Sequence, residues 1–479
     1  MLFRDRVYGI ENEYGRTLKR IDEEMDPYYY PVVQIFLRTI DCSVMPPLIS
    51  RPRVWHSNGS CTYVDTGDHP EHATAECRLV RDVVAHNKAG ELLIAKIFAL
   101  ARERSFDVRL FKNNFGYNEL LEREHSFGCH ENYLAPVFNV ENPAHIQRIV
   151  PFLLSRQIID GVGLWEGGAY HYSPRAYAID HESASGTTSQ RGIVCMKKSY
   201  ETGTIPRLHL ILGDSNILEC AIFLKIGMTS LVLSLIEEDK APEITCMDSV
   251  RSLHRVSREG ALADVVWMKN NEFISAHEIQ ARYLEAVLRE LSGGRFESEE
   301  TEAELKEIAR LWEQALNAVY AHDIKWMLGH LDWATKQYLA EYYLKKNAVT
   351  NESDRFSVCR DFDIAYHAVS DRTLQEKMNA RWADRRIVTD AQIADACVHA
   401  PDTRARMRED FVRKVFAENL ALRTRIDWAV LGDLENMDNI FYMNNPLECH
   451  APDWDLFLER FAELCRKSPK SSHNPPIVY

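Results

Sequence analysis

The feature that most constrains this fold is a run of twenty mostly apolar residues, ILECAIFLKIGMTSLVLSLI, at positions 217–236. A run of this length is stable either in a bilayer or inside a large core. Glu219 and Lys225 interrupt it near the positions that a membrane span would bury, which favours a buried core helix. Asn216 followed by Glu219 fits a helix N-cap with its returning acid. We therefore expect this helix at the centre of the core.

The composition supports a large folded enzyme or binding protein. The chain has 479 residues, of which 46 % are hydrophobic, enough for one large domain and a small one. Its net charge of −14 disfavours nucleic acid and anionic membranes as partners. Eleven cysteines form no C-x-x-C pair and leave an odd count, which is typical of reduced thiols. No export signal opens the sequence, so we expect a cytoplasmic protein.

Short strand-like runs alternate with long amphipathic helices along the chain. The strand candidates are 7–14, 60–64, 74–79, 108–112, 126–134, 207–212 and 263–268. Their irregular spacing and hairpin-length turns indicate an α+β fold with a mainly antiparallel sheet. Apolar stripes predict helices at 89–104 and 302–320. A polar stretch near residue 400 predicts a large domain over 1–400 and a small one over 401–479.

Two glutamates in the motif GIENEYG are candidates for a metal site. Glu11 and Glu13 are two residues apart, so on a strand they share a face, roughly 7 Å from each other. One interpretation is a solvent-facing sheet edge with polar alternation. The other is a pair of oxygen ligands for a hard cation such as Mg²⁺, which takes carboxylate and phosphate oxygens together.

The stretch SNGSCTYVDTGDHPEHATAEC repeats this arrangement at residues 57–77. Tyr63 and Asp65 share a strand face, and a turn through residues 67–70 brings Glu71 close to the strand end. His69 and His72 raise the alternative of a zinc site, but no cysteine pair or H-E-x-x-H motif surrounds them. We therefore expect these imidazoles to be satisfied by neighbouring acids.

Three further stretches place polar residues among strand-like ones, namely LFKNNFGYN, FGCHENYL and PRLHLILGDSN. In the last, Arg207 and His209 share a face opposite two leucines. The stretches together suggest an open sheet whose concave face is polar and can hold a polyphosphate with its metals. No P-loop and no G-x-G-x-x-G unit occurs, so a bound nucleotide would be held by acids and metals on the sheet.

Ten motifs extend this interpretation across nearly the whole chain. They are GIENEYG, NGSCTYVDTGDHPEHATAEC, LFKNN, GCHENYL, PFLLSRQIIDG, RLHLILGDSN, LKIGMTSLVL, LDWATK, DTRARMR and IDW. In this order the sequence resembles the Pup ligase and Pup deamidase family, which attaches or removes small ubiquitin-like bacterial modifiers. The resemblance implies a glutamine-synthetase-like large domain with a small C-terminal domain, and ATP and Mg²⁺ as cofactors.

The resemblance also implies a role for individual residues. The family's magnesium positions match Glu11, Tyr63 and Glu71. Its catalytic base matches Asp65, and its ATP contacts match Thr74 and Trp428. By extension, we assign a metal role to Glu13 and His209 and a phosphate role to Arg207.

Two departures from the family pattern stand out. Cys61 occupies a position in the nucleotide site where the family usually has an arginine that touches ATP. That contact is then lost or comes from another residue, for which Arg53 is a candidate. The loop at 196–203, MKKSYETG, replaces a family loop that is acidic and contains proline and histidine. This second departure suggests a divergent Pup-like modifier.

The spacing of the first two motifs favours the ligase branch, because residues 16–57 leave little room for the long insertion of the deamidases. We expect an ATP-dependent ligase that phosphorylates the C-terminal glutamate of a small Pup-like modifier and joins it to lysines of target proteins. Three alternatives remain: a deamidase or isopeptidase using water at the same site, a small-molecule glutamate-amine ligase, and a non-catalytic binding protein.

Overall fold

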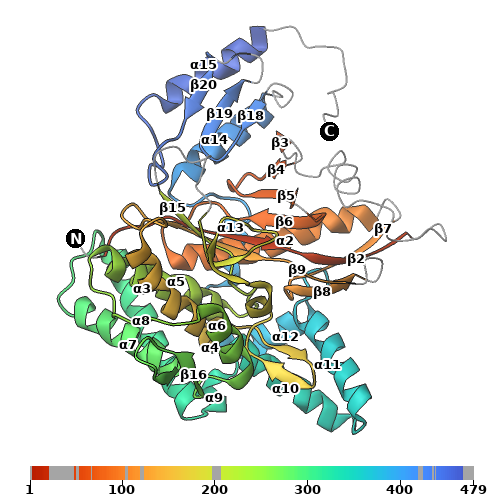
Figure 1. The fold of residues 1–479 in the computed structure, drawn as a ribbon. Helices are drawn as coiled ribbons and strands as arrows, with labels where there is room; N and C mark the ends of the chain where they lie inside the picture. The colour runs from red at the N-terminus through yellow and green to blue at the C-terminus, as the bar shows by residue number, and fades with distance from the viewer. Residues whose placement is uncertain are drawn as a thin grey trace.

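A nine-stranded sheet forms the middle of the molecule (Figure 1). The computed structural model describes residues 3–20, 48–49, 53–65, 67–102, 106–118, 123–196, 206–418, 424–433, 436 and 438–467. The strand order in the sheet is β13-β14-β15-β10-β1-β6-β5-β4-β3. All its neighbouring pairs are antiparallel except β13 with β14. The predicted α+β class with a mainly antiparallel sheet is confirmed.

The strands of this sheet are β1 (Tyr8–Glu13), β3 (Leu48–Ile49), β4 (Arg53–Trp55), β5 (Cys61–Asp65), β6 (His69–Ala73), β10 (Cys129–Leu134), β13 (His181–Ala184), β14 (Gly192–Cys195) and β15 (Arg207–Leu210). Small separate sheets contain β2 (Gly15–Arg20), β7 (Phe106–Phe111), β8 (Phe115–Asn118), β9 (Arg123–Ser126), β11 (Leu164–Glu166), β12 (Ala169–His171), β16 (Asp264–Trp267), β17 (Phe273–Ser275), β18 (Thr424–Ile426), β19 (Val430–Asp433) and β20 (Ile440–Tyr442).

The α-helices of the described chain are α2 (Val80–Arg102), α3 (Pro143–Ser155), α4 (Gln157–Asp160), α5 (Glu219–Glu237), α6 (Ser249–Glu259), α7 (Ala276–Leu291), α8 (Glu299–Tyr320), α9 (Ile324–Met327), α10 (Asp332–Lys346), α11 (Glu352–Tyr366), α12 (Thr373–Arg381), α13 (Asp390–Ala396), α14 (Arg404–Ala417) and α15 (Trp454–Lys467). Short 3₁₀ turns lie at η1 (Arg175–Ala178) and η2 (Ala383–Arg385). Helices α2 and α8 include the two helices that the apolar stripes predict.

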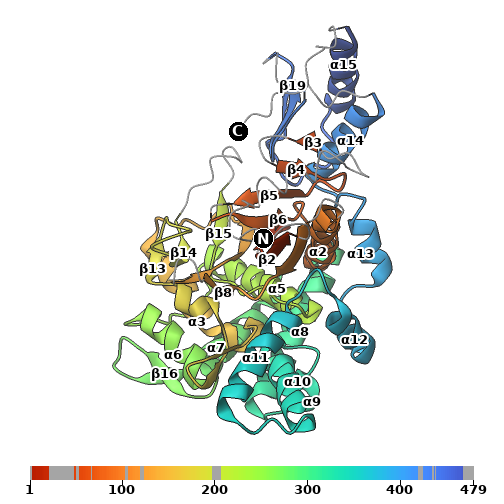
Figure 2. The same cartoon turned by 90° about the vertical axis from the view of Figure 1, so that its right-hand side faces the viewer.

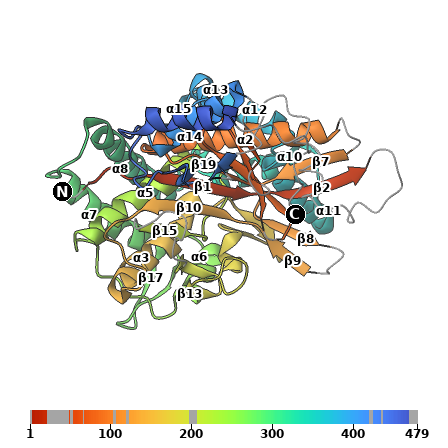
Figure 3. The same cartoon turned by 90° about the horizontal axis from the view of Figure 1, so that it is seen from above.

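The sheet has one covered face and one open face. Along β1 the burial alternates, so that Tyr8, Ile10 and Asn12 point into the helical layer and Glu11 and Glu13 point away from it. Helices α2 and α3 pack against the covered face, and α5 lies beneath them (Figure 2). Figure 3 shows β1, β10 and β15 running side by side in the view from above. Alternation along each strand therefore decides which polar residues reach the open face.

Helix α5 confirms the predicted core helix. It is the one described helix long and apolar enough to cross a membrane, and the apolar part of it is wholly buried in the protein. The predicted N-cap is wrong, because α5 starts at Glu219 after Leu218 and has no side-chain cap. Asn216 instead donates to the Asp160 carbonyl and the Asp332 carboxylate. The Glu219 carboxylate accepts hydrogen bonds from the Arg386 side chain and from the backbone amides of Ile387 and Val388.

The predicted strand at 74–79 is also wrong. The strand that pairs with β5 is β6, which comes earlier in the chain and includes Pro70 and His72. Residues 74–79 form an extended connection into α2, with single ladder contacts such as the amide of Cys77 donating to the carbonyl of Tyr8. Because polar and apolar residues are mixed over the whole stretch, its pattern identifies a strand here but does not define where the strand ends.

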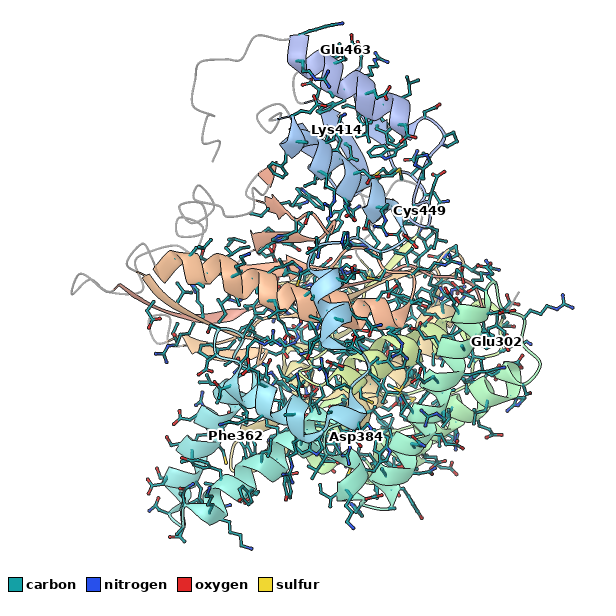
Figure 4. All side chains as sticks on the ribbon, turned by 180° about the vertical axis from the view of Figure 1, so that it is seen from behind. Glu302, Phe362, Asp384, Lys414, Cys449 and Glu463 are labelled. Atoms are coloured by element: carbon teal, nitrogen blue, oxygen red, sulfur yellow. The ribbon has the colours of Figure 1, made fainter. Side chains whose placement is uncertain are left out.

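The C-terminal elements stand above the open face of the sheet. Seen from behind, α14 with Lys414 and α15 with Glu463 lie above the main body, which carries Glu302 and Phe362 on its lower helices (Figure 4). Their apolar cluster includes Phe411, Leu431, Trp454 and Phe461, and it continues into Trp55 and Cys61 of the sheet. The division at residue 400 stays a prediction.

Candidate active site

Two rows of side chains cross the open face of the sheet. Antiparallel partners at the same register share a face, so the pairs Glu13–Glu71, Glu71–Tyr63 and Tyr63–Arg53 form one row over four strands. A second row runs through His130, Glu11, Ala73, Cys61 and Trp55. The charged ends of both rows meet on β1, where Glu11 and Glu13 lie.

The first row ends in a cluster of three carboxylates. Oxygen atoms of Glu13, Asp65 and Glu71 all lie within 4.8 Å of one another. Burial and the charges of Glu11, Glu13 and Asp65 raise the pKa of Glu71 well above its usual value. The Tyr63 hydroxyl donates to Glu71 over 2.6 Å. Uncompensated carboxylates at this spacing repel one another, so the cluster requires a cation or shared protons.

A second cluster with mixed ligands adjoins the first. Glu11, His130 and His209 each offer one ligand atom, and these three atoms lie within 4.8 Å of one another. Burial opposes the charge of Glu11, but the His130 hydrogen bond and the charges of His209 and Arg207 outweigh it and hold its pKa well below the usual value. Burial likewise opposes the Glu13 charge, and contacts with His69 and His130 lower its pKa to about 2.

Asn132 connects the acidic residues to the basic ones in the second cluster. Its side-chain oxygen accepts from Arg207 and from Nδ1 of His209, both over 2.8 Å. Its side-chain nitrogen donates to Glu11 over 3.1 Å. The bond from Nδ1 leaves Nε2 of His209 as the ligand atom, since the two ring nitrogens of a neutral imidazole have opposite roles.

The donor set of both clusters fits a divalent metal ion. Glu13, Asp65 and Glu71 offer only oxygen atoms, as Mg²⁺ prefers. Glu11, His130 and His209 offer a mixed oxygen and nitrogen set. Five of the six residues come from four adjacent strands of the sheet, in the order β15, β10, β1 and β6. The sixth, Asp65, lies on β5, the next strand along.

Of the residues assigned to ATP, Trp428 lies at the β4 end of the rows and Thr74 lies beside β1. Trp428 follows β18 and packs edge-on against Trp55, with their ring centres 4.8 Å apart. The guanidinium of Arg408 lies 5.1 Å from the centre of the Trp428 ring. Thr74 accepts a hydrogen bond from the amide of Ile10 over 3.0 Å. Trp428 and Trp55 thus form an aromatic shelf on the same side of the sheet as the carboxylates.

Cys61 lies between these two ends. Its side chain is fully buried in the apolar cluster with Trp55 and Met407. Burial raises the pKa of its thiol, so the side chain is uncharged at neutral pH. Its assignment as a nucleotide contact stays a prediction, as do the roles assigned to Thr74 and Trp428.

Part of the polar sequence does not reach the open face. His69 and His72 point to opposite faces of β6, which excludes a joint zinc site, and His72 is buried against Thr62. The LFKNN stretch also lies in the helical layer, where Lys112 pairs with Glu91. The predicted polar concave face is therefore formed by fewer residues than expected. Residues 197–203 of the divergent loop lie outside the described residues.

The comparison with known proteins fits this geometry. A family model described as "Pup-ligase protein" matches residues 6–431. The chain belongs to the Pup-ligase family. The Pup–protein ligases of Pseudarthrobacter chlorophenolicus and Xylanimonas cellulosilytica are each 32 % identical to it, over 447 and 449 residues, and the matches cover 89 % of this chain and 92 % and 93 % of the relatives.

Two solved structures are also similar over most of the chain. The first is a complex between the prokaryotic ubiquitin-like protein Pup and its ligase PafA, with a TM-score of 0.80 and 25 % identity, covering 98 % of this chain and 99 % of the other. The second is the Pup ligase PafA in complex with ADP, with a TM-score of 0.75 and 26 % identity, covering 87 % and 91 %. The resemblance stated from the sequence is confirmed.

Sequence reasoning missed Asn132 as a site residue and gave His130 no role. His130 and Asn132 are two residues apart in the CHENYL strand, so they share one face, and His130 is the register partner of Glu11. The missing information was which face of β10 is open, since Glu131 in the same motif points into the helical layer and pairs with Arg156.

Proposed function

We propose that this chain is an ATP-dependent ligase that joins the C-terminal glutamate of a small Pup-like protein to lysine side chains of target proteins. One observation carries the proposal. In a member of the Pup-ligase family, the carboxylates of Glu13, Asp65 and Glu71 gather on the open face of the sheet, beside the aromatic shelf formed by Trp428 and Trp55. Mg²⁺ takes carboxylate and phosphate oxygens together, and an aromatic ring can stack against a nucleotide base.

The first half of the reaction activates a carboxylate. An amine cannot displace an oxide from a carboxylate, so the modifier's glutamate takes the γ-phosphate of ATP and becomes an acyl phosphate, with ADP released. Glu11, Glu13, Tyr63, Glu71 and His209 would hold Mg²⁺, which would neutralise charge on the phosphoryl group. Arg207 adds a fixed positive charge 3.7 Å from Glu11 on the same face.

The second half forms the isopeptide bond. The lysine nitrogen attacks the acyl carbon, a C–N bond forms, the C–O bond to phosphate breaks, and inorganic phosphate leaves. A lysine has a pKa near 10.4 and must lose a proton to react. We assign the acceptance of that proton to Asp65, which lies at the end of β5 beside Glu13 and Glu71. General bases of this kind contribute about 10² to 10⁴ in rate.

The remaining partners follow from the same chemistry. One of the similar structures contains Pup bound to its ligase PafA, and the other contains PafA bound to ADP, which supports a Pup-like modifier and ATP as substrates here. No disulfide bond joins the cysteines that the structure describes, which supports a cytoplasmic location. We also propose that residues 401–479 form a small domain that completes the nucleotide site through Trp428.

The test combines conjugation with nucleotide binding. The purified chain, ATP, Mg²⁺, a Pup-like protein ending in glutamate and a lysine-bearing target should yield a conjugate detectable by mass spectrometry. Asp65→Asn should bind ADP like the wild type and lose conjugation by about 100-fold or more. Asp384→Asn, on an exposed turn far from the site, is the matched control (Figure 4).

Two results would contradict the proposal. Conjugation by Asp65→Asn at the wild-type rate would remove this residue as the base. Release of the modifier from a purified conjugate, without any conjugation in the forward assay, would instead assign the hydrolytic branch of the family.

A further inference from the structure

We infer that Arg53 is a phosphate-binding residue of the nucleotide site, where it bridges the aromatic shelf and the acidic clusters. This inference rests on the proposed function, because it assumes that a nucleotide binds between Trp428 and the carboxylates. Arg53 begins β4, and its register partner on β5 is Tyr63. It is therefore the fourth member of the row that contains Glu71 and Glu13.

The contacts of Arg53 place it between the two halves of the site. Its guanidinium carbon lies 5.5 Å from the centre of the Tyr63 ring. Its Nη1 donates to the Asp427 carboxylate over 3.4 Å, and Asp427 immediately precedes Trp428. The side chains of Arg53 and Asp427 are 31 % and 37 % exposed, so solvent and solutes reach both. A nucleotide that stacks at Trp428 and extends to Glu71 must pass this guanidinium.

Charge balance also favours Arg53 as a phosphate ligand. At the β15 end of the open face, positive charge comes from Arg207, which lies 3.7 Å from Glu11. At the β4 end, Arg408 lies near Trp428, but its side chain is fully buried and pairs with Glu76, whereas Arg425 on β18 is half-buried. Cys61, in the neighbouring row, is buried and uncharged. Arg53 is thus an accessible cation at this end of the described site, and it is the one in register with Tyr63 and Glu71.

The geometry of a guanidinium suits this task. It presents five N–H donors in a plane, so it can keep the Asp427 contact and donate to phosphate oxygens as well. Asp427 holds the group in place and also ties β4 to the loop that carries Trp428. A nucleotide would therefore bind both the sheet and the C-terminal elements through neighbouring residues.

The experiment compares ADP with adenosine on Arg53→Gln and Arg53→Lys. Affinities are measured by displacement of a fluorescent ADP analogue from the whole chain. Arg53→Gln should weaken ADP binding about tenfold or more and leave adenosine binding unchanged, because the lost bond is to phosphate. Arg53→Lys should bind ADP more tightly than Arg53→Gln but less tightly than the wild type. Lysine keeps the positive charge but lacks the planar set of N–H donors of a guanidinium.

A matched control and two contrary results complete the test. Arg109→Gln removes an exposed arginine from β7, on a separate small sheet, and should change neither affinity. If Arg53→Gln binds ADP like the wild type, the inference fails. If it weakens ADP and adenosine equally, Arg53 acts only by packing against Tyr63, and the inference fails as well. Failure of the wild type to bind ADP would instead contradict the proposed function.

Discussion

At the scale of single residues, the site depends on side chains that hold other side chains. Asn132 makes three hydrogen bonds, to Glu11, Arg207 and His209, and so fixes an acid, a cation and an imidazole in one arrangement. The sequence shows the identity of these residues but not this sharing, because the three bonds join three strands. A residue that touches no substrate can therefore determine the geometry of a metal site.

Replacing Asn132 tests this positioning role. Asn132→Leu keeps a similar volume and removes all three bonds, so Glu11 and His209 lose their fixed orientation. We expect Mn²⁺ binding, measured by titration calorimetry in the absence of nucleotide, to weaken about 10- to 100-fold. Asn317→Ala, on the exposed face of α8, should leave it unchanged. Unaltered metal affinity in Asn132→Leu would show that this residue only fills space.

At the scale of elements, sequence patterns predict which segments are helices and strands better than where each begins. The apolar stripes locate α2 and α8. The alternation along β1 correctly predicts that Glu11 and Glu13 share one face of the sheet. The β5–β6 hairpin is harder to place, because Pro70 sits inside β6, where proline is unusual in an interior strand. The same limit applies to Asn216, whose fit to a cap motif is overridden by its tertiary contacts with Asp332.

The contact between α2 and the sheet gives the element-scale prediction. A Cβ at Gly90 of α2 would lie 2.3 Å from Cδ2 of the His72 ring, which is buried and bonded to Thr62. Gly90→Ala must therefore push the helix or the ring away, and we expect a loss of about 1–3 kcal/mol in the free energy of unfolding. Chemical denaturation with fluorescence detection measures it.

A second glycine provides the control for this prediction. Gly293, in the turn after α7, has open space around its Cβ position and no strained φ. Gly293→Ala should have little effect or stabilise slightly, since alanine restricts the unfolded chain. Equal effects of the two substitutions would mean that α2 does not depend on close contact at Gly90.

At the scale of the whole molecule, a buried ion cluster connects the sheet to the C-terminal elements. Glu76, just after β6, pairs with Arg404 over 2.7 Å and with Arg408, both on α14. Arg408 also donates to the carbonyl of Trp428 over 2.8 Å. The family resemblance predicts that Trp428 belongs to the nucleotide site, but only the structure shows that Glu76, beside the β5–β6 hairpin, is connected to the loop of Trp428 through Arg408.

Acid should weaken this connection. Burial opposes the Glu76 charge, but the charges and hydrogen bonds of Arg408 and Arg404 outweigh it and lower its pKa to about 2. Because the folded pKa lies below the unfolded value near 4.5, the pair contributes its full stability above about pH 4.5. That contribution, about 3 kcal/mol, is lost as the pH falls towards 2.

Glu76→Gln isolates this contribution from the rest of acid unfolding. At pH 7 the variant should unfold about 3 kcal/mol more easily than the wild type, and the difference should shrink steadily as the pH falls from 4.5 towards 2. Denaturant titrations at a series of pH values, followed by tryptophan fluorescence, measure both curves. Glu463→Gln, on the exposed face of α15, should follow the wild type throughout. A gap between Glu76→Gln and wild type that stays constant with pH would mean that Glu76 contributes by packing rather than by its charge.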